Sequence, residues 1–177
     1  MATEIEVVST VADSYFSLKD LLRKVEDITS ELAIGYNLVE QMVYFKRNGE
    51  RVESETIVEN PSAYYDIFTR DGEKLFSIWG PDHDVEGGIF TAEEKINDSP
   101  KFDSKLLPEL VARAAEVNTS YTVRWSPTGN DLLVYTVCLG LSELISGVIV
   151  NQFGASVESG TYLVEDWRTL LRNEIGK

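Results

Sequence analysis

Hydrophobic positions after Ser17 recur with the period of an amphipathic helix. Ser17 and Asp20 have the spacing of a capping box, in which each side chain bonds the backbone N–H of the other residue. Charged residues fill the positions between the apolar ones, so we expect a helix with one face in water. Gly35 is expected to end this helix, because glycine is common just after a helix C-terminus. The apolar stripe consists of Leu18, Leu21, Leu22, Val25, Ile28 and Leu32.

Between Val39 and Trp79 the pattern becomes strand-like. The segments VEQMVYF and RVESETIV flank Asn48-Gly49, and the segments AYYDIFT and KLFSIW flank Asp71-Gly72. Asn-Gly and Asp-Gly between such segments favour tight hairpin turns. The pattern therefore predicts two hairpins, or four antiparallel strands. The second pair is apolar on both faces and is expected to lie centrally in the sheet.

Glycine and proline interrupt residues 80–103, which we expect to form a loop. A helix is predicted from Ser104 to about Asn118, with Pro108 tolerated in its first turn. Residues 120–125 then alternate as a strand, and residues 127–130 form a turn.

The segment 131–146 is the most apolar and is expected to be the most buried. A helix capped by Asn130 or Asp131 and stopped by Gly147 is favoured, although its run of β-branched and aromatic residues would also suit a strand. Residues 147–150 should form a short inner strand. The final helix carries apolar residues at helical spacing, namely Val164, Trp167, Leu170 and Leu171.

Length and composition indicate one globular domain. A chain of 177 residues with 43% hydrophobic and 26% charged residues is close to the globular average, and one core suffices at this size. Neither an internal repeat nor a linker divides the sequence. We predict a single α+β domain over residues 1–177, with a mainly antiparallel sheet built from hairpins and three or four helices packed on it.

The chain is strongly acidic, with 30 acidic residues against 16 basic ones and a formal net charge of −14. This balance disfavours nucleic acid and membranes as partners. The acids concentrate in residues 50–98, which either bind a basic surface or only keep the protein soluble. There is no secretory signal pattern and no membrane-length apolar run, and Cys138, as the single cysteine, forms no internal disulfide. A cytoplasmic location is expected.

Motifs for catalysis and cofactor binding are missing. No glycine-rich phosphate loop and no G-x-S-x-G elbow is present. Cys138 and His83 are the only thiol and imidazole, and Cys138 lies in an apolar segment where thiols are usually inert. The cluster Asp82-His83-Asp84 with Glu86 could hold a metal, but it is too short for a calcium loop and lacks a second zinc-type ligand. We interpret this cluster as a solvated turn, and expect no enzyme activity, no metal and no cofactor.

Two further groups of residues are assigned to structure. The neighbouring acids Glu93 and Glu94, like Glu165 and Asp166, would point apart on a helix and are assigned to the surface. A group of aromatic residues is assigned to core packing, because the interleaved basic residues that a stacking groove needs are too few. These aromatics are Tyr64, Tyr65, Phe68, Phe76 and Trp79.

Residues 132–171 combine an apolar helix, a glycine followed by a GVIV strand, a turn and an acidic, aromatic final helix. This order resembles the C-terminal part of immunity proteins that bacteria encode beside polymorphic or contact-dependent toxins. The resemblance implies a cytoplasmic antitoxin that binds and neutralises a toxin. An adaptor or structural subunit, and an enzyme with a metal site at residues 82–86, remain the alternatives.

Acidic residues on such an inhibitor would steer it toward a basic toxin domain, and an aromatic side chain would supply affinity. We expect the toxin-binding surface to comprise Trp79 or Phe90 as an anchor with Asp82, Asp84, Glu86, Glu93 and Glu94.

Overall fold

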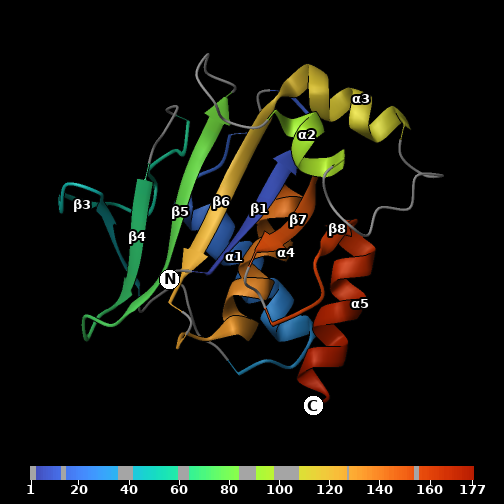
Figure 1. Cartoon of the computed structure of the whole chain (residues 1–177). Coiled ribbons are helices and arrows are strands. Elements are labelled where there is room, and N and C mark those ends of the chain that lie inside the picture. The colour runs from blue at the N-terminus through green and yellow to red at the C-terminus, as the bar shows by residue number, and fades with distance from the viewer. Residues whose placement is uncertain are drawn as a thin grey trace.

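An antiparallel sheet of eight strands forms the middle of the protein, in the order β3-β2-β4-β5-β6-β1-β7-β8 (Figure 1). The computed structural model describes residues 3–12, 15–35, 42–59, 64–83, 91–97, 108–126, 128–153 and 156–177. The strands are β1 (Thr3–Ser9), β2 (Met42–Lys46), β3 (Arg51–Val52), β4 (Tyr64–Thr69), β5 (Lys74–His83), β6 (Thr119–Trp125), β7 (Gly147–Phe153) and β8 (Gly160–Tyr162). The helices within these ranges are α1 (Leu18–Glu31), α2 (Ala92–Asn97), α3 (Pro108–Val117), α4 (Asp131–Leu144) and α5 (Val164–Ile175).

The two faces of the sheet are covered unequally. Helices α1, α4 and α5 pack on one face, and their apolar residues join those of the strands in the main core. Helices α2 and α3 lie on the opposite face, at one end of the sheet, where a second and smaller cluster covers Val8, Val148 and Val150 (Figure 1). The rest of this second face carries no helix among the described residues. The expected α+β fold is confirmed, and the described ranges contain five helices where three or four were expected.

Strand β1 lies between β6 and β7 and was not predicted from the sequence. Its side chains alternate between the two faces: Ile5 and Val7 belong to the main core, and Val8 belongs to the smaller cluster. The sequence TEIEVVS contains the strand signal as apolar alternation after Glu4. A strand buried on both faces at its C-terminal end explains why Val7 and Val8 are both fully buried.

The segment 131–146 forms helix α4 over Asp131–Leu144, as favoured, and the helix is deeply buried. Residues 133–142 of α4 are all buried, because the sheet, α1 and α5 surround this helix. Asn130 caps it by accepting a hydrogen bond from the Leu133 backbone N–H at 3.0 Å. Gly140 permits close packing on α1, since a Cβ atom there would lie 3.1 Å from Val25 Cγ2.

Both predicted hairpins are confirmed, and β4 and β5 lie inside the sheet. The prediction of a loop over residues 80–103 is wrong at two places. Strand β5 continues to His83, because its backbone pairs with β6 as far as Thr119, and residues 92–97 form helix α2. Helix α3 begins at Pro108 in the described part of the chain and ends before Asn118, which has a positive φ of 46°.

The capping box of α1 is confirmed. The Asp20 backbone N–H donates to Ser17 Oγ at 3.0 Å, and the Ser17 N–H donates to Asp20 Oδ2 at 3.2 Å. Hydrogen bonds from Ser17 hold the pKa of the Asp20 carboxyl below its usual value. The expected stop at Gly35 is wrong: the helix ends at Glu31, and Ala33 takes the left-handed conformation, with a φ of 56°.

Substitution of Ser17 by alanine tests this cap. We expect the free energy of unfolding at pH 7 to fall by about 1 kcal/mol. Because the folded-state pKa of Asp20 is lowered, its contribution is present above the unfolded pKa of roughly 3.9 and is lost as the pH falls through the folded value. The difference in the free energy of unfolding between Ser17→Ala and the parent protein should therefore narrow in acid. Urea titrations at several pH values measure the free energy of unfolding, with Ser30→Ala at the other end of α1 as the control. An equal loss of stability in both variants would contradict the role of Ser17 as the helix cap.

Gly147 is required where β7 begins beside β1. A Cβ atom there would lie 2.9 Å from both Val7 Cγ1 and the Val8 carbonyl oxygen. We expect Gly147→Ala to lower the free energy of unfolding by about 1–3 kcal/mol through overpacking. Gly35→Ala is the matched control, because no atom lies within 4 Å of its added methyl group. Chemical denaturation followed by circular dichroism compares the two, and equal stability of both variants would show that the close approach is relaxed at no cost.

Candidate functional site

The part of the second sheet face that α2 and α3 leave uncovered is the candidate functional surface, here called the open face. Strand alternation sets its composition: Tyr65 and Ile67 of β4 point into the main core. The residues that alternate with them along β4, namely Tyr64, Asp66 and Phe68, therefore point to the open face. They are half-buried. On β5 the same alternation places Ser77 and Trp79 there, opposite Asp66 and Tyr64 of β4.

A row of hydrogen bonds crosses the open face between β4 and β5. Tyr64 donates its hydroxyl proton to Ser77 Oγ at 3.0 Å, and Ser77 donates to Asp66 Oδ1 at 2.6 Å. Lys74 Nζ lies 2.6 Å from the same carboxylate oxygen. The Trp79 ring meets the Tyr64 ring edge to face, with centroids 6.4 Å apart. This row fixes the aromatic side chains in place and neutralises the one carboxylate among them.

A buried lysine anchors α2 to the sheet. Lys95 is 6% exposed, and its ammonium group donates to Ser120 Oγ at 2.8 Å and lies 3.3 Å from Glu6 Oε1. The backbone N–H of Ala92, at the start of α2, donates to the Asn118 side chain at 3.0 Å. These contacts come from β1, β6 and the end of α3, so α2 is held in one position relative to the sheet.

The outer surface of α2 and α3 is acidic. Both helices expose carboxylates, while the only cation of α2 is the buried Lys95 and the described cation of α3 is Arg113, which is exposed. Glu94 also caps its own helix, since it accepts hydrogen bonds from the backbone and the hydroxyl of Thr91. We call this surface the acidic helix pair. Its exposed acids are Glu93, Glu94, Glu109 and Glu116.

The structure brings together part of the predicted toxin-binding set. Glu93 and Glu94 are exposed on α2, and Trp79 is half-buried on the open face. The backbone of Asp82 is opposite Ser120 of β6, the residue that Lys95 contacts from α2. Asp84, Glu86 and Phe90 lie outside the described residues, as do the side chains of Asp82 and His83.

The single thiol is buried in the main core. Cys138 has no exposed surface, and burial raises the pKa of its thiol, so the reactive thiolate is disfavoured. In the described ranges no group of three or more histidine, cysteine or acidic side chains is arranged to hold a metal ion. The helices in these ranges also include none with the length and hydropathy needed to cross a bilayer.

The assignment of five aromatics to the core is correct only for Tyr65 and Phe76, which are buried in it. Tyr64, Phe68 and Trp79 lie on the open face instead, because alternation on an internal strand directs every second side chain there. Basic residues also reach this face. Arg47, Arg51 and Arg70 are separated along the chain, but strand pairing brings them to one edge of this face.

Comparisons with protein-family models, with curated proteins and with solved structures each found no match.

The Lys95 anchor can be tested by replacing it with methionine, which keeps most of the apolar part of the side chain but removes the ammonium group and its charge. We expect the free energy of unfolding to fall by about 1–3 kcal/mol, because the largely buried Glu6 carboxylate loses a charged hydrogen-bonding partner. Lys46→Met is the control, since its pair with Glu50 is exposed on both sides, and exposed pairs contribute at most about 1 kcal/mol. Urea denaturation measures both variants. If Lys95→Met lowers the free energy of unfolding by no more than Lys46→Met, the pair of Lys95 with Glu6 does not hold α2 in place.

Proposed function

We propose that this protein is an immunity protein, a binding module that neutralises a basic bacterial toxin domain through the acidic helix pair and the adjoining end of the open face. The observation that carries the proposal is the separation of charge on α2: its carboxylates are exposed, while its only cation, Lys95, is turned inward and paired with Glu6. At low ionic strength, where screening is weak, the net charge of −14 adds to the attraction of a basic partner.

Such a surface suits an inhibitor for two physical reasons. Clustered carboxylates raise the rate of encounter with a basic partner and fix its orientation. The helix pair is also held rigidly, because Ala92, Ile96 and Ala114 are buried against Val8, Val148 and Val150. Little conformational entropy is then lost on binding. Trp79 is the proposed anchor, since half-buried tryptophan side chains on a fixed surface are frequent hot spots.

An adaptor subunit would use the same surface to bind a basic protein that is not a toxin. The two functions differ in what binding does to the partner. An immunity protein abolishes the toxicity of its partner in growing cells, whereas an adaptor leaves its partner active. Capture of partners from a native lysate at low salt, followed by expression of each basic partner with and without this protein, separates the two.

Charge reversal tests the surface itself. The double variant Glu93→Lys with Glu116→Lys should slow association with the captured partner by about tenfold at low salt and flatten its salt dependence. The control is Asp27→Lys with Glu165→Lys, which changes the net charge equally on helices α1 and α5. Glu94 is left intact, because its helix cap would be lost. Stopped-flow or surface-binding kinetics measure the rates. Unchanged kinetics in the first variant, or equal slowing in both, would exclude the acidic helix pair as the interface.

A further inference from the structure

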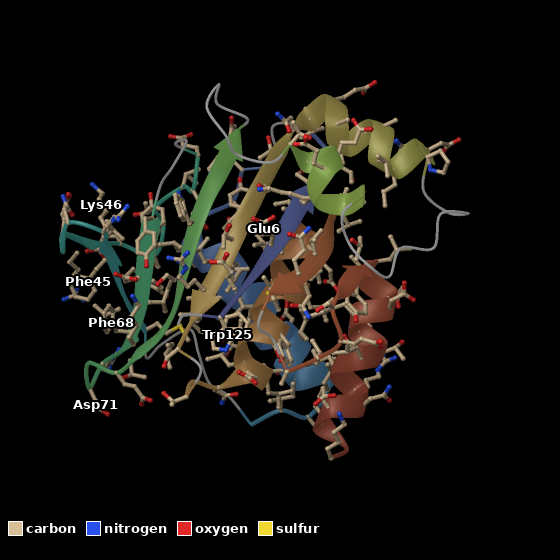
Figure 2. The ribbon with its side chains drawn as sticks, viewed as in Figure 1. Glu6, Phe45, Lys46, Phe68, Asp71 and Trp125 are labelled. Atoms are coloured by element: carbon tan, nitrogen blue, oxygen red, sulfur yellow. The ribbon has the colours of Figure 1, made fainter. Side chains whose placement is uncertain are left out.

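A second surface of opposite charge lies at the other edge of the open face. It is a groove of about 580 Å³ that runs from the Asn48-Gly49 turn to the turn containing Gly72. We call it the basic groove. In Figure 2, Phe45 and Phe68 lie between Lys46 on one side and Asp71 on the other.

The floor of the basic groove is apolar. Val43 is opposite Phe68 in the pairing of β2 with β4, and Phe45 follows on the same face of β2. The Phe45 and Phe68 rings meet edge to face, with centroids 5.5 Å apart at an angle of 88°. All three side chains are only half-buried, because no helix covers them in the described structure. The strands thus present an apolar strip to solvent.

The rim of the basic groove is cationic. Lys46, Arg47, Arg51 and Arg70 line it, and Asp66 is the only acid that does so in the described part of the chain. Asp66 is neutralised by Lys74, and Lys46 is paired with Glu50. Among the described residues, no carboxylate is within ion-pair distance of Arg47, Arg51 or Arg70; Arg47 instead stacks over the Tyr64 ring at 5.7 Å. In a chain of net charge −14, three exposed arginines at one apolar strip are available to an anion from outside.

The neighbouring sheet edge is incomplete. Strand β3 pairs only with Tyr44 and Phe45 of β2, so its ladder does not extend to Met42 and Val43. A second hollow of about 320 Å³ lies there, and it shares Val43, Arg51 and Arg70 with the basic groove. An edge at which pairing stops short accepts an additional extended chain through backbone hydrogen bonds. The two hollows adjoin at these three shared residues, and Glu53 also lines the second one.

We propose that the basic groove binds a short, extended, acidic peptide segment of a protein partner, in which carboxylates alternate with apolar side chains. The period of two in an extended chain would place carboxylates toward Arg51 and Arg70 and apolar side chains toward Phe45 and Phe68. A nucleic acid fits less well, because a longer polyanion would reach the exposed acids around the groove. These are Glu50, Asp71 and Glu73, which adjoin lining residues in the sequence.

This site is independent of the acidic helix pair, which takes a partner of the opposite charge. Loss of one binding activity therefore leaves the other intact, and each proposal can fail alone.

The test uses a fluorescein-labelled octapeptide in which glutamate alternates with leucine and phenylalanine, titrated with the full-length protein and followed by fluorescence anisotropy. Three further probes are compared: the same peptide with lysine for glutamate, the same peptide with serine for the apolar residues, and an oligothymidine of similar length. The protein variants are Arg51→Glu with Arg70→Glu, and the control Arg23→Glu with Arg113→Glu, which has the same net charge. All four arginines are exposed, and thermal melts establish that the variants are folded.

We expect the acidic peptide to bind the parent protein. Its affinity should fall at least about tenfold in the variant Arg51→Glu with Arg70→Glu but not in the control variant. Added salt should lower the affinity of the acidic peptide. The peptides with lysine in place of glutamate, or serine in place of the apolar residues, should bind more weakly than the acidic peptide. Three outcomes would overturn the proposal: no binding of the acidic peptide at millimolar protein, equal loss in both double variants, or tighter binding of oligothymidine, which would make the groove a nucleic-acid site.

Discussion

The unequal covering of the sheet is the constraint on which the rest of the structure depends. Eight strands need apolar cover on both faces or a surface that water tolerates. Among the described residues, three helices cover one face while two helices cover only an end of the other. The uncovered strands must satisfy their own polar groups. They do so through side-chain rows, with Asp66, Ser77 and Tyr64 on β4 and β5 and the Arg124 guanidinium on Glu4 across β6 and β1.

Charge on the second face is divided between its two ends. The acidic helix pair lies over the end of β6, β1 and β7 (Figure 1). Residues of β2, β3 and β4 line the basic groove. Screening at physiological salt limits exposed charges to a range of about 8 Å, so each end acts on its own neighbourhood despite the negative total. A partner with one basic and one acidic region would be bound in a single orientation. In the reversed orientation, its basic region would face the basic groove and its acidic region the acidic helix pair, so like charges would meet at both ends.

Local signals in the sequence sufficed for much of the fold. The Ser17 and Asp20 capping box, the Asn48-Gly49 and Asp71-Gly72 turns and the apolar run of α4 are each short-range patterns with a direct structural reason. Helix α2 was missed because it has only six residues and depends on Lys95 and Asn118, whose partners are distant in the sequence. Strand β1 was missed although its alternation was visible.

The candidate site was less predictable, because it depends on which residues strand pairing brings together. The acids of residues 50–98 look like one acidic region in the sequence, but the described ones belong to separate parts of the fold: Asp66 lines the basic groove, whereas Glu93 and Glu94 are exposed on α2. Arg51 and Arg70 are 19 positions apart in the sequence and line the same groove. Only the order of β3, β2 and β4 reveals this, and no local pattern encodes that order.

The measurement that tests the account most directly is an NMR titration of the isotope-labelled protein with two probes of opposite charge, a lysine-rich peptide and the alternating acidic and apolar octapeptide. The account predicts that the first shifts amide signals of α2 and α3 and the second shifts those of β2, β3 and β4, with little overlap. Shifts by both probes at the same residues, or shifts spread evenly over the protein, would contradict the division of this face into two binding surfaces.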